Sequence, residues 1–379
     1  MRTATAAKVN RKRLRANGAE GQRRGRTSGR VRILDVNAQP NTSFRGLVLA
    51  LFFVIAATAL AANHANSPAP APNEQILRAQ LFLDGSAFKP GAIDAGWGEF
   101  MGKALSRYEE AQGKSKTTYG KTAPAEFDLP LDATRAQLIS YTLSPNDQKF
   151  IGPLPKSHAA QAKLSGLPYE NFLELVAEKF HARTPFLKEI NPGYDWNKAK
   201  PGDSVQVPNV AAPFDLQEAI DLKASTEAAE KANTLPTEKT KPASEQCALF
   251  VSVAQKIMEL KCGGKLIGSY PITPGSKSLP APVGEWFVRG FSWMPTFRWD
   301  EAMLHHDERS GDFYNLPPGP NNPVGIVWME LNHKGSGIHG TEEPETIGRA
   351  TSHGCIRLSN WDALDLGKKV LPDVHVSIR

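Results

Sequence analysis

The hydrophobic positions in the last third of the chain follow the short period of β-strands. The apolar runs LFVSV, KIMELKC and KLIGSYPI are separated by turn residues, and GEWFVRGF and GIVWMEL follow downstream. Short apolar runs punctuated by turns predict a mostly antiparallel sheet over residues 247–379. One late helix is expected at residues 359–370, with Ser359 as its N-cap ahead of Asp362.

Residues 74–113 show the longer period of helices. Apolar side chains recur at helical spacing in residues 75–83 and again in residues 98–110, and glycines and Pro90 interrupt the pattern between them. The sequence ILRAQLFLDGSAFKPGAIDAGWGEFMGKALSRYEEAQG resembles the helical peptidoglycan-binding domain of wall hydrolases. The alternative is a helical hairpin that binds no ligand.

A second small module is expected at residues 169–209. Residues 169–181 have helical spacing, and Thr184 before Pro185 is expected to cap a second helix that ends before residue 191. The segment KPGDSVQVP then predicts a turn and a short strand. Together with INPGYDW it resembles the LysM domain, a carbohydrate-binding βααβ unit, although no first strand is evident. Retained glycan binding and a fold without that activity both stay open.

The positive charge of the chain is concentrated at its N-terminus. Residues 1–46 contain twelve Lys or Arg against Glu20 and Asp35, which leaves 33 basic and 37 acidic side chains elsewhere. An uncharged apolar run at residues 47–62 and a Pro-rich tether at residues 63–73 follow. This order predicts a signal peptide or N-terminal membrane anchor, and therefore an exported protein of the periplasm or cell wall. Only this segment is expected to touch a membrane, and nucleic acid is not expected as a partner.

The length and the changes in composition predict several domains. At 379 residues the chain exceeds the usual size of one hydrophobic core. Residues 213–246 are rich in Ala, Glu, Lys, Thr and Pro and are expected to link the two small modules to the C-terminal domain. The expected fold class is therefore multidomain α+β, with small helical and βααβ-like modules ahead of a β domain.

The sequence contains only three cysteines. If the first C-terminal hairpin turns at Ala254-Gln255, Cys247 and Cys262 lie directly opposite one another, and an exported protein can form that disulfide. The alternative is two ordinary strand cysteines. A disulfide would leave Cys355 as the one cysteine outside it.

Chemically active side chains gather near the C-terminus, in IHGT at residues 338–341 and SHGCIRL at residues 352–358. A cysteine nucleophile needs a base, a group that orients the base, and backbone N–H donors for an oxyanion, and this segment contains residues for each role. A zinc site or plain packing residues are the alternatives, although no paired ligand motif of the usual zinc spacing occurs.

These two motifs, with GSYPITPG and PAPVGEW upstream, resemble the L,D-transpeptidase (YkuD) catalytic domain over residues 247–379. The PAPVG segment departs slightly from the family's usual Thr-Pro-x-Gly. The resemblance implies that Cys355 is the nucleophile and His339 the general base, which the backbone of Gly340 orients. It further implies the following roles: His353 shapes the site, Ser352 supplies the hydroxyl of the motif, and Gly354 allows a tight turn while its N–H and that of Cys355 bind the oxyanion.

Two further residues are candidates for substrate binding. Arg357 is placed to hold a substrate carboxylate, and the alternative is an ion pair within the domain. Tyr314, in the segment of residues 293–323, is a candidate for a substrate lid.

The reaction that the resemblance implies begins with attack of the thiolate on the third residue of a peptidoglycan stem peptide. Terminal D-alanine leaves, and a thioester remains. A second stem peptide, water or a protein amine is the acceptor, so an L,D-carboxypeptidase is one alternative, and a non-catalytic wall-binding protein is another. No cofactor or metal is expected, the partners are stem peptides and glycan strands, and acylation of Cys355 by carbapenems is predicted.

Overall fold

The computed structural model describes residues 73–242, 245–276, 279–306, 309–350 and 354–379. The predicted leader, the apolar run at residues 47–62 and all but the last residue of the tether lie outside these ranges, as do Ser352 and His353. Within the described ranges, the helices are all too short or too polar to cross a membrane.

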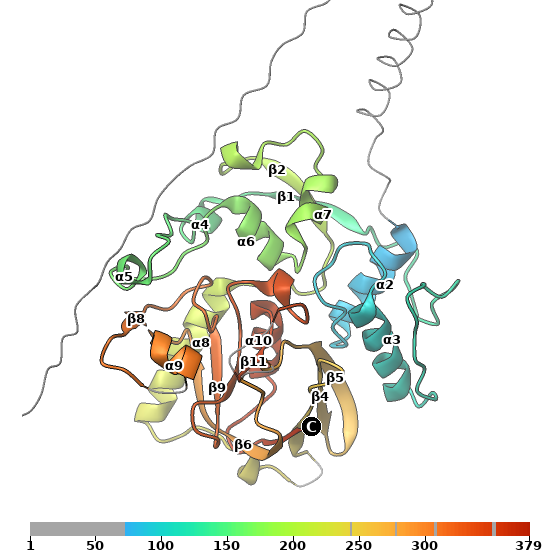
Figure 1. The fold of residues 1–379 in the computed structure, drawn as a ribbon. Helices are drawn as coiled ribbons and strands as arrows, with labels where there is room; N and C mark the ends of the chain where they lie inside the picture. The colour runs from blue at the N-terminus through green and yellow to red at the C-terminus, as the bar shows by residue number, and fades with distance from the viewer. Residues whose placement is uncertain (1–72, 243–244, 277–278, 307–308, 351–353) are drawn as a thin grey trace, which may run out of the picture. The chain divides into compact units, whose positions relative to one another are not determined.

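An eight-stranded sheet forms the C-terminal domain (Figure 1). Its order is β11-β10-β9-β6-β12-β3-β4-β5, and only the β10–β11 and β12–β3 pairs are parallel. The predicted mostly antiparallel sheet, and with it the α+β fold class, is confirmed. The strands are β3 (Cys247–Ser252), β4 (Ile257–Cys262), β5 (Lys265–Pro271), β6 (Gly284–Trp293), β9 (Val327–Leu331), β10 (Gly337–His339), β11 (Ile356–Arg357) and β12 (His375–Ile378).

The predicted late helix is α10 (Asn360–Gly367), which packs beside β9. The Ser359 hydroxyl accepts a hydrogen bond from the Asp362 N–H at 3.3 Å, so the predicted N-cap is confirmed. Trp361 and Leu364 turn into the hydrophobic core between the helix and the sheet. A smaller ribbon of β7 (Phe297–Trp299) and β8 (Tyr314–Leu316), with α9 (Glu301–His306) between its strands, extends from the same domain.

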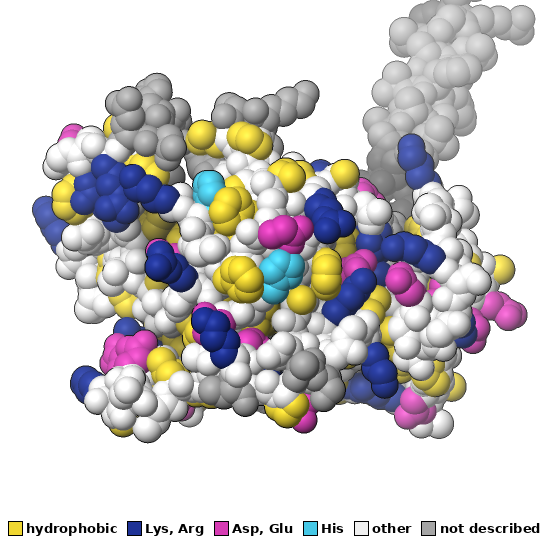
Figure 2. Space-filling view, turned by 90° about the horizontal axis from the view of Figure 1, so that it is seen from below, with side chains coloured by type: hydrophobic (Ala, Val, Ile, Leu, Met, Phe, Trp, Pro, Cys, Tyr) yellow, Lys and Arg dark blue, Asp and Glu magenta, His cyan; other side chains and the backbone are white. Residues whose placement is uncertain are grey.

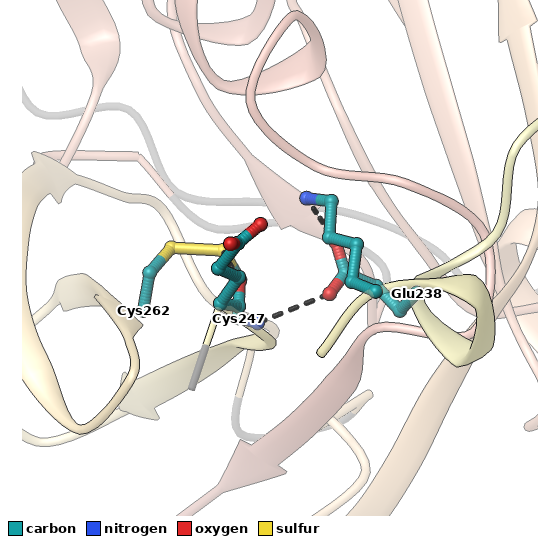
Figure 3. The surroundings of a disulfide bond; sticks show 5 residues. Glu238, Cys247 and Cys262 are labelled. Atoms are coloured by element: carbon teal, nitrogen blue, oxygen red, sulfur yellow. Dashed lines mark hydrogen bonds and ion pairs between the residues drawn. A yellow bond between two sulfur atoms is a disulfide. The ribbon is translucent and has the colours of Figure 1, made fainter. Parts of the chain in front are cut away.

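Of the two alternatives left open for Cys247 and Cys262, the structure shows the disulfide. Cys247 on β3 lies opposite Cys262 on β4, and their sulfur atoms are bonded. A carboxylate oxygen of Glu238, from the short 3-10 helix η2 (Glu238–Thr240), accepts a hydrogen bond from the Cys247 N–H at 3.1 Å (Figure 3). The end of the segment expected to be a linker is therefore attached to the first strand of the sheet.

The two helices expected in residues 74–113 are α2 (Glu74–Gly85) and α3 (Glu99–Ala111). The chain between them runs along the exposed edge of the large sheet at β5. The Lys89 N–H donates to the Ser269 carbonyl at 2.8 Å, and the Ser269 N–H donates to the Ala87 carbonyl at 3.0 Å. The module thus covers a strand edge that would otherwise present unpaired backbone groups.

The second module contains a strand that the sequence did not reveal. Strand β1 (Leu138–Thr142) pairs with β2 (Ser204–Pro208) along its whole length, but it lies some thirty residues ahead of the expected start at residue 169. The βααβ order is therefore complete, with a long insertion after the first strand. The intervening elements are α4 (Pro145–Gln148), α5 (His158–Gln161), α6 (Phe172–Lys179), α7 (Thr184–Glu189) and η1 (Trp196–Lys198).

The predicted N-cap of α7 is wrong by one residue. Arg183 occupies the N-cap without a side-chain hydrogen bond, and Thr184 is the first helical residue. The Thr184 N–H instead donates to a carboxylate oxygen of Glu345 at 2.6 Å. A side chain from the C-terminal domain thus accepts the hydrogen bond of an N-terminal N–H group of the helix. A local cap was expected to play this part.

The segment expected to be a linker is partly helical and packed. Helix α8 (Leu216–Lys231) begins at the N-cap Asp215, contacts β6, and joins Glu218 to Lys368 in an ion pair at 2.9 Å. On the face drawn in Figure 2, basic and acidic side chains are interspersed among small hydrophobic groups. The described part of that face therefore carries both positive and negative side chains.

Candidate active site

A cavity of about 870 Å³ opens in the C-terminal domain, and four residues singled out from the sequence line it: His339, Gly354, Cys355 and Arg357. The parallel pairing of β10 with β11 brings these residues together. It places His339 opposite Arg357, and Arg357 follows Cys355 by two residues. The hydrophobic part of the wall includes four aromatic side chains, Trp293, Phe297, Trp299 and Trp328.

His339 is buried, with 4% of its surface exposed. Its Nδ1 lies 2.6 Å from the Gly340 carbonyl oxygen, so Nδ1 carries a proton and donates it to that acceptor. This is the contact expected of Gly340, and it leaves Nε2 as the basic nitrogen. Burial lowers the pKa of His339 to about 3, and the positive charge of Arg357 contributes to the shift. The imidazole is therefore neutral at pH 7.

Asn360 holds the turn that follows the base. Its Oδ1 accepts hydrogen bonds from the N–H groups of Thr341 and Ile326, both at 3.2 Å. A Cβ at Gly340 would come within 2.2 Å of this oxygen, so only glycine fits there. The motif at residues 338–341 predicted a role for Gly340. Nothing in the sequence around Asn360, except its position after the helix N-cap Ser359, indicated its role.

Cys355 follows a glycine in the left-handed region, since Gly354 has a φ of +93°. Such a φ favours glycine and allows the tight turn expected at this position. The Cys355 Sγ lies 3.7 Å from the Gly335 carbonyl oxygen. Desolvation raises the pKa of the thiol above its ordinary value of 9.0, although the nearby Arg357 charge and a backbone hydrogen bond oppose the shift.

Arg357 lines the cavity, and its Nε has no hydrogen-bond partner. This Nε is buried, and no ion pair to the guanidinium occurs among the described residues. Two other cavity-lining donors, Arg298 Nε and Trp299 Nε1, are buried in the same unpaired state. All three donors belong to residues that line the cavity, although the donor atoms themselves are covered.

Tyr314 is not brought into the site. It lies on β8 with 39% of its surface exposed and is not among the residues that line the cavity. Other members of the segment of residues 293–323 do line it, and sequence reasoning did not single out any of them individually. Arg298 is one; its Nη2 is held by Asp300 at 3.1 Å. Within the described ranges, no three His, Cys, Asp or Glu side chains gather closely enough to hold a metal ion.

Residues 248–378 match the family described as the L,D-transpeptidase catalytic domain. The chain is 26% identical over 206 residues to a putative L,D-transpeptidase YkuD of Bacillus licheniformis, which covers 54% of this chain and 92% of that protein. It is 31% identical over 137 residues to a putative L,D-transpeptidase YqjB of Bacillus subtilis, covering 34% of this chain and 70% of that protein.

Solved structures of L,D-transpeptidases show a partial likeness to this chain. An L,D-transpeptidase from Mycobacterium smegmatis is 18% identical, with a TM-score of 0.30 over 35% of this chain and 58% of that chain. The L,D-transpeptidase LdtMt1 in complex with imipenem is 19% identical, with a TM-score of 0.28 over 35% of this chain and 58% of that one. On the sequence matches over residues 248–378, and on the coverage of the YqjB protein, the chain belongs to the L,D-transpeptidase family.

Proposed function

We propose that this protein is a peptidoglycan L,D-transpeptidase that works through a thioester on Cys355. The observation that carries the proposal is the neutral, buried His339, whose basic Nε2 is set by the Nδ1 bond to Gly340 and which lines the same cavity as Cys355. A neutral imidazole that lines the same cavity as a protonated thiol is suited to general-base activation of the attacking sulfur.

In the proposed acylation, Sγ of Cys355 bonds to the carbonyl carbon of the third stem-peptide residue as its proton passes to Nε2 of His339. The oxyanion is bound by the N–H groups of Gly354 and Cys355. The C–N bond to D-alanine then breaks, and the imidazolium returns the proton to the leaving amine. An acceptor amine attacks the thioester and gives its proton to His339. The C–S bond breaks as the new amide forms, and the imidazolium returns the proton to the departing sulfur.

The arginines of the cavity wall support a stem peptide as the donor substrate. Stem peptides carry carboxylates, and the guanidinium groups of Arg357 and Arg298, which line the cavity, suit such groups. Lys334 and Arg309 add positive charge to the same wall, which also contains the carboxylates of Asp300, Glu342 and Glu343. In this proposal Arg357 binds a substrate carboxylate instead of forming an internal ion pair.

We also place the protein outside the cytoplasm, in the periplasm or cell wall. The basic leader and apolar run at residues 1–62 support export, and the Cys247–Cys262 disulfide is of the kind that persists in oxidising compartments. The two N-terminal modules are proposed to bind glycan strands. Cell fractionation that finds the mature protein in the cytosol would contradict the proposed location.

The test is incubation of the purified chain with a disaccharide-tetrapeptide, beside Cys355→Ala, with products identified by mass spectrometry. A dimer that has lost one D-alanine, absent with Cys355→Ala, is the expected result. Loss of D-alanine without a dimer would show an L,D-carboxypeptidase, in which water is the acceptor. No product from either protein would favour a wall-binding protein without this activity.

Carbapenem acylation is a separate prediction of the same site. The L,D-transpeptidase LdtMt1 has been solved in complex with imipenem. A β-lactam carbonyl attacked by Cys355 would give a thioester adduct with the mass of the intact drug, because ring opening expels no fragment. Mass spectrometry after treatment with imipenem is expected to show this addition, and an adduct that persists in Cys355→Ala would contradict it.

A further inference from the structure

The segment that joins the base to the nucleophile is held by both N-terminal modules. Residues 340–350, here called the β10–β11 segment, follow His339 and lead toward Cys355. Glu342 and Glu343 of this segment line the active-site cavity. Any displacement of the segment therefore changes the wall of the cavity and the spacing of its two reactive side chains.

The second module contacts the segment at Glu345, which lies in the short 3-10 helix η3 (Pro344–Thr346). One carboxylate oxygen accepts a hydrogen bond from the Thr184 N–H at 2.6 Å, and the other lies 4.0 Å from Arg183 Nε. The Thr184 N–H is one of the N-terminal donors of α7, where the helix dipole favours a carboxylate. The contact thus gives an N-terminal N–H group of α7 an acceptor, and it also holds the Glu345 carboxylate in place.

The first module contacts the segment at Gly348. The Phe100 ring of α3 lies so close to the Gly348 backbone that a Cβ there would come within 2.0 Å of Cζ. Gly348 has a φ of +75°, which also favours glycine. Lys103, on the next turn of α3, lies over the same ring at 5.2 Å, so the ring is held between the helix and the segment.

The same glycine is connected to β11, the strand that begins directly after the nucleophile. The Gly348 N–H donates to the Thr273 hydroxyl at 2.7 Å, and the Gly348 carbonyl accepts from Lys256 Nζ at 2.6 Å. Thr273 also exchanges backbone hydrogen bonds of 3.0 and 2.9 Å with Arg357 on β11. A shift at Gly348 would therefore reach β11 and Cys355 through a single residue.

We propose that the two N-terminal modules are part of the catalytic apparatus: Phe100 and the Thr184 N–H are positioning groups that hold the β10–β11 segment, and with it His339 and Cys355, in the arrangement for acyl transfer. The inference rests on the proposed function. It adds that residues of modules resembling wall-binding domains control the turnover of a site they do not line.

Two matched pairs of variants of the full chain test the proposal. Thr184→Pro removes the N–H donor at a helical position that accepts proline, whereas Thr184→Ala keeps that N–H. Phe100→Ala removes the ring from Gly348, whereas Phe82→Ala removes a ring from the interior of the same module, where it packs on Tyr108. For each variant, kcat and KM for the tetrapeptide, the iodoacetamide alkylation rate of Cys355, and the thermal unfolding midpoint are measured.

We expect Thr184→Pro and Phe100→Ala to lower kcat by about 10- to 100-fold with little change in KM, because positioning is lost while the binding wall remains. Thr184→Ala and Phe82→Ala are expected to keep kcat, even where Phe82→Ala lowers the unfolding midpoint. Equal loss of kcat in both members of a pair, or unchanged kcat in Thr184→Pro and Phe100→Ala, would overturn the proposal.

The alkylation rate separates this proposal from the proposed reaction. If the wild-type chain forms no product from the tetrapeptide, the proposed function fails, but Cys355 can still be alkylated. A rate that changes in Thr184→Pro and Phe100→Ala and not in their partners would then support the positioning role by itself. Rates equal to wild type in all four variants would overturn it.

Discussion

Cys355 and His339 are both neutral in the resting protein for the same physical reason. Desolvation disfavours the charged form of each group, so it raises the pKa of the thiol and lowers the pKa of the imidazole to about 3. The positive charge of Arg357 lowers both values, which favours the thiolate and disfavours the imidazolium. Charge separation between sulfur and nitrogen is therefore expected to develop only as a substrate is attacked.

This description predicts how the thiol reacts with a small alkylating agent. Because the thiolate is the reactive form and its formation is disfavoured, the iodoacetamide rate of Cys355 should rise with pH through a midpoint above 9. The rate is measured by mass spectrometry at a series of pH values, with Cys355→Ala as the blank. A plateau that is already reached near pH 6 would instead indicate a preformed thiolate–imidazolium pair.

At the scale of elements, the N-terminus of α10 holds the catalytic loops together. Ser359 caps the helix, and the next residue, Asn360, accepts the N–H groups of Ile326 and Thr341 while its Nδ2 donates to the Pro320 carbonyl at 3.2 Å. One buried amide thus joins two separate loops, the one between β8 and β9 and the one after β10, to the helix. The base His339 takes its orientation from Gly340, which lies directly against this amide.

Asn360→Ala is expected to reduce both stability and activity. It leaves two buried N–H groups without an acceptor, and each costs about 1–3 kcal/mol of unfolding free energy. Urea unfolding measures the loss, and Ser359→Ala, which removes only the cap and costs about 1 kcal/mol, is the control. If Asn360→Ala is no less stable than Ser359→Ala, the assigned role of the amide is incorrect.

The β3–β4 hairpin is closed by the Cys247–Cys262 disulfide, whose cysteines are 15 residues apart. Closing a loop of that length lowers the entropy of the unfolded chain and stabilises the fold by about 3 kcal/mol. We expect dithiothreitol to lower the unfolding free energy of Cys355→Ala by about this amount, since that background removes any reaction of the third thiol. Unchanged urea unfolding curves with and without the reductant would contradict the prediction.

At the scale of the whole molecule, buried polar groups join residues 73–209 to the catalytic domain. Tyr169 donates a hydrogen bond to Glu178 on α6, and burial raises the pKa of Glu178 to about 8. Nearby, His181 stacks on Trp361 with ring centroids 5.3 Å apart and contacts the buried carboxylate of Asp84 at 3.0 Å. The α6 helix therefore meets the same end of α10 that holds the turn after His339.

The raised pKa of Glu178 makes stability depend on pH with a definite sign. Between pH 4.5 and 8 the folded protein keeps the proton while the unfolded chain loses it, so the contribution of Glu178 to stability falls as pH rises. Glu178→Gln keeps a neutral hydrogen-bonding group and removes this dependence. The unfolding midpoint of Glu178→Gln should therefore exceed that of wild type by a margin that grows from pH 5 to 8, and a constant margin would contradict the assignment.

Particular residues show how far the sequence could predict the structure. Cys247 and Cys262 are equally distant from the turn at residues 254–255, so local register was enough to place them opposite one another. The N-cap Ser359 and the turn at Gly354 could also be predicted, because each depends on residues that are adjacent in the sequence. Strand β1 was missed because its partner, β2, lies more than sixty residues away, and the N-cap of α7 was misplaced because its acceptor belongs to Glu345.

By itself the sequence determined the catalytic family, the alternation of strands and turns in residues 247–379, the helices of both small modules, and the candidate pair Cys355 and His339. These depend on short-range patterns and on residue chemistry, which a linear chain displays directly. Only the tertiary structure decided that Asn360 supports the base, that Tyr314 lies away from the cavity, and that Phe100 and Thr184 contact the β10–β11 segment. Those relations join residues far apart in sequence, and they exist only when the packing of whole modules brings the side chains together.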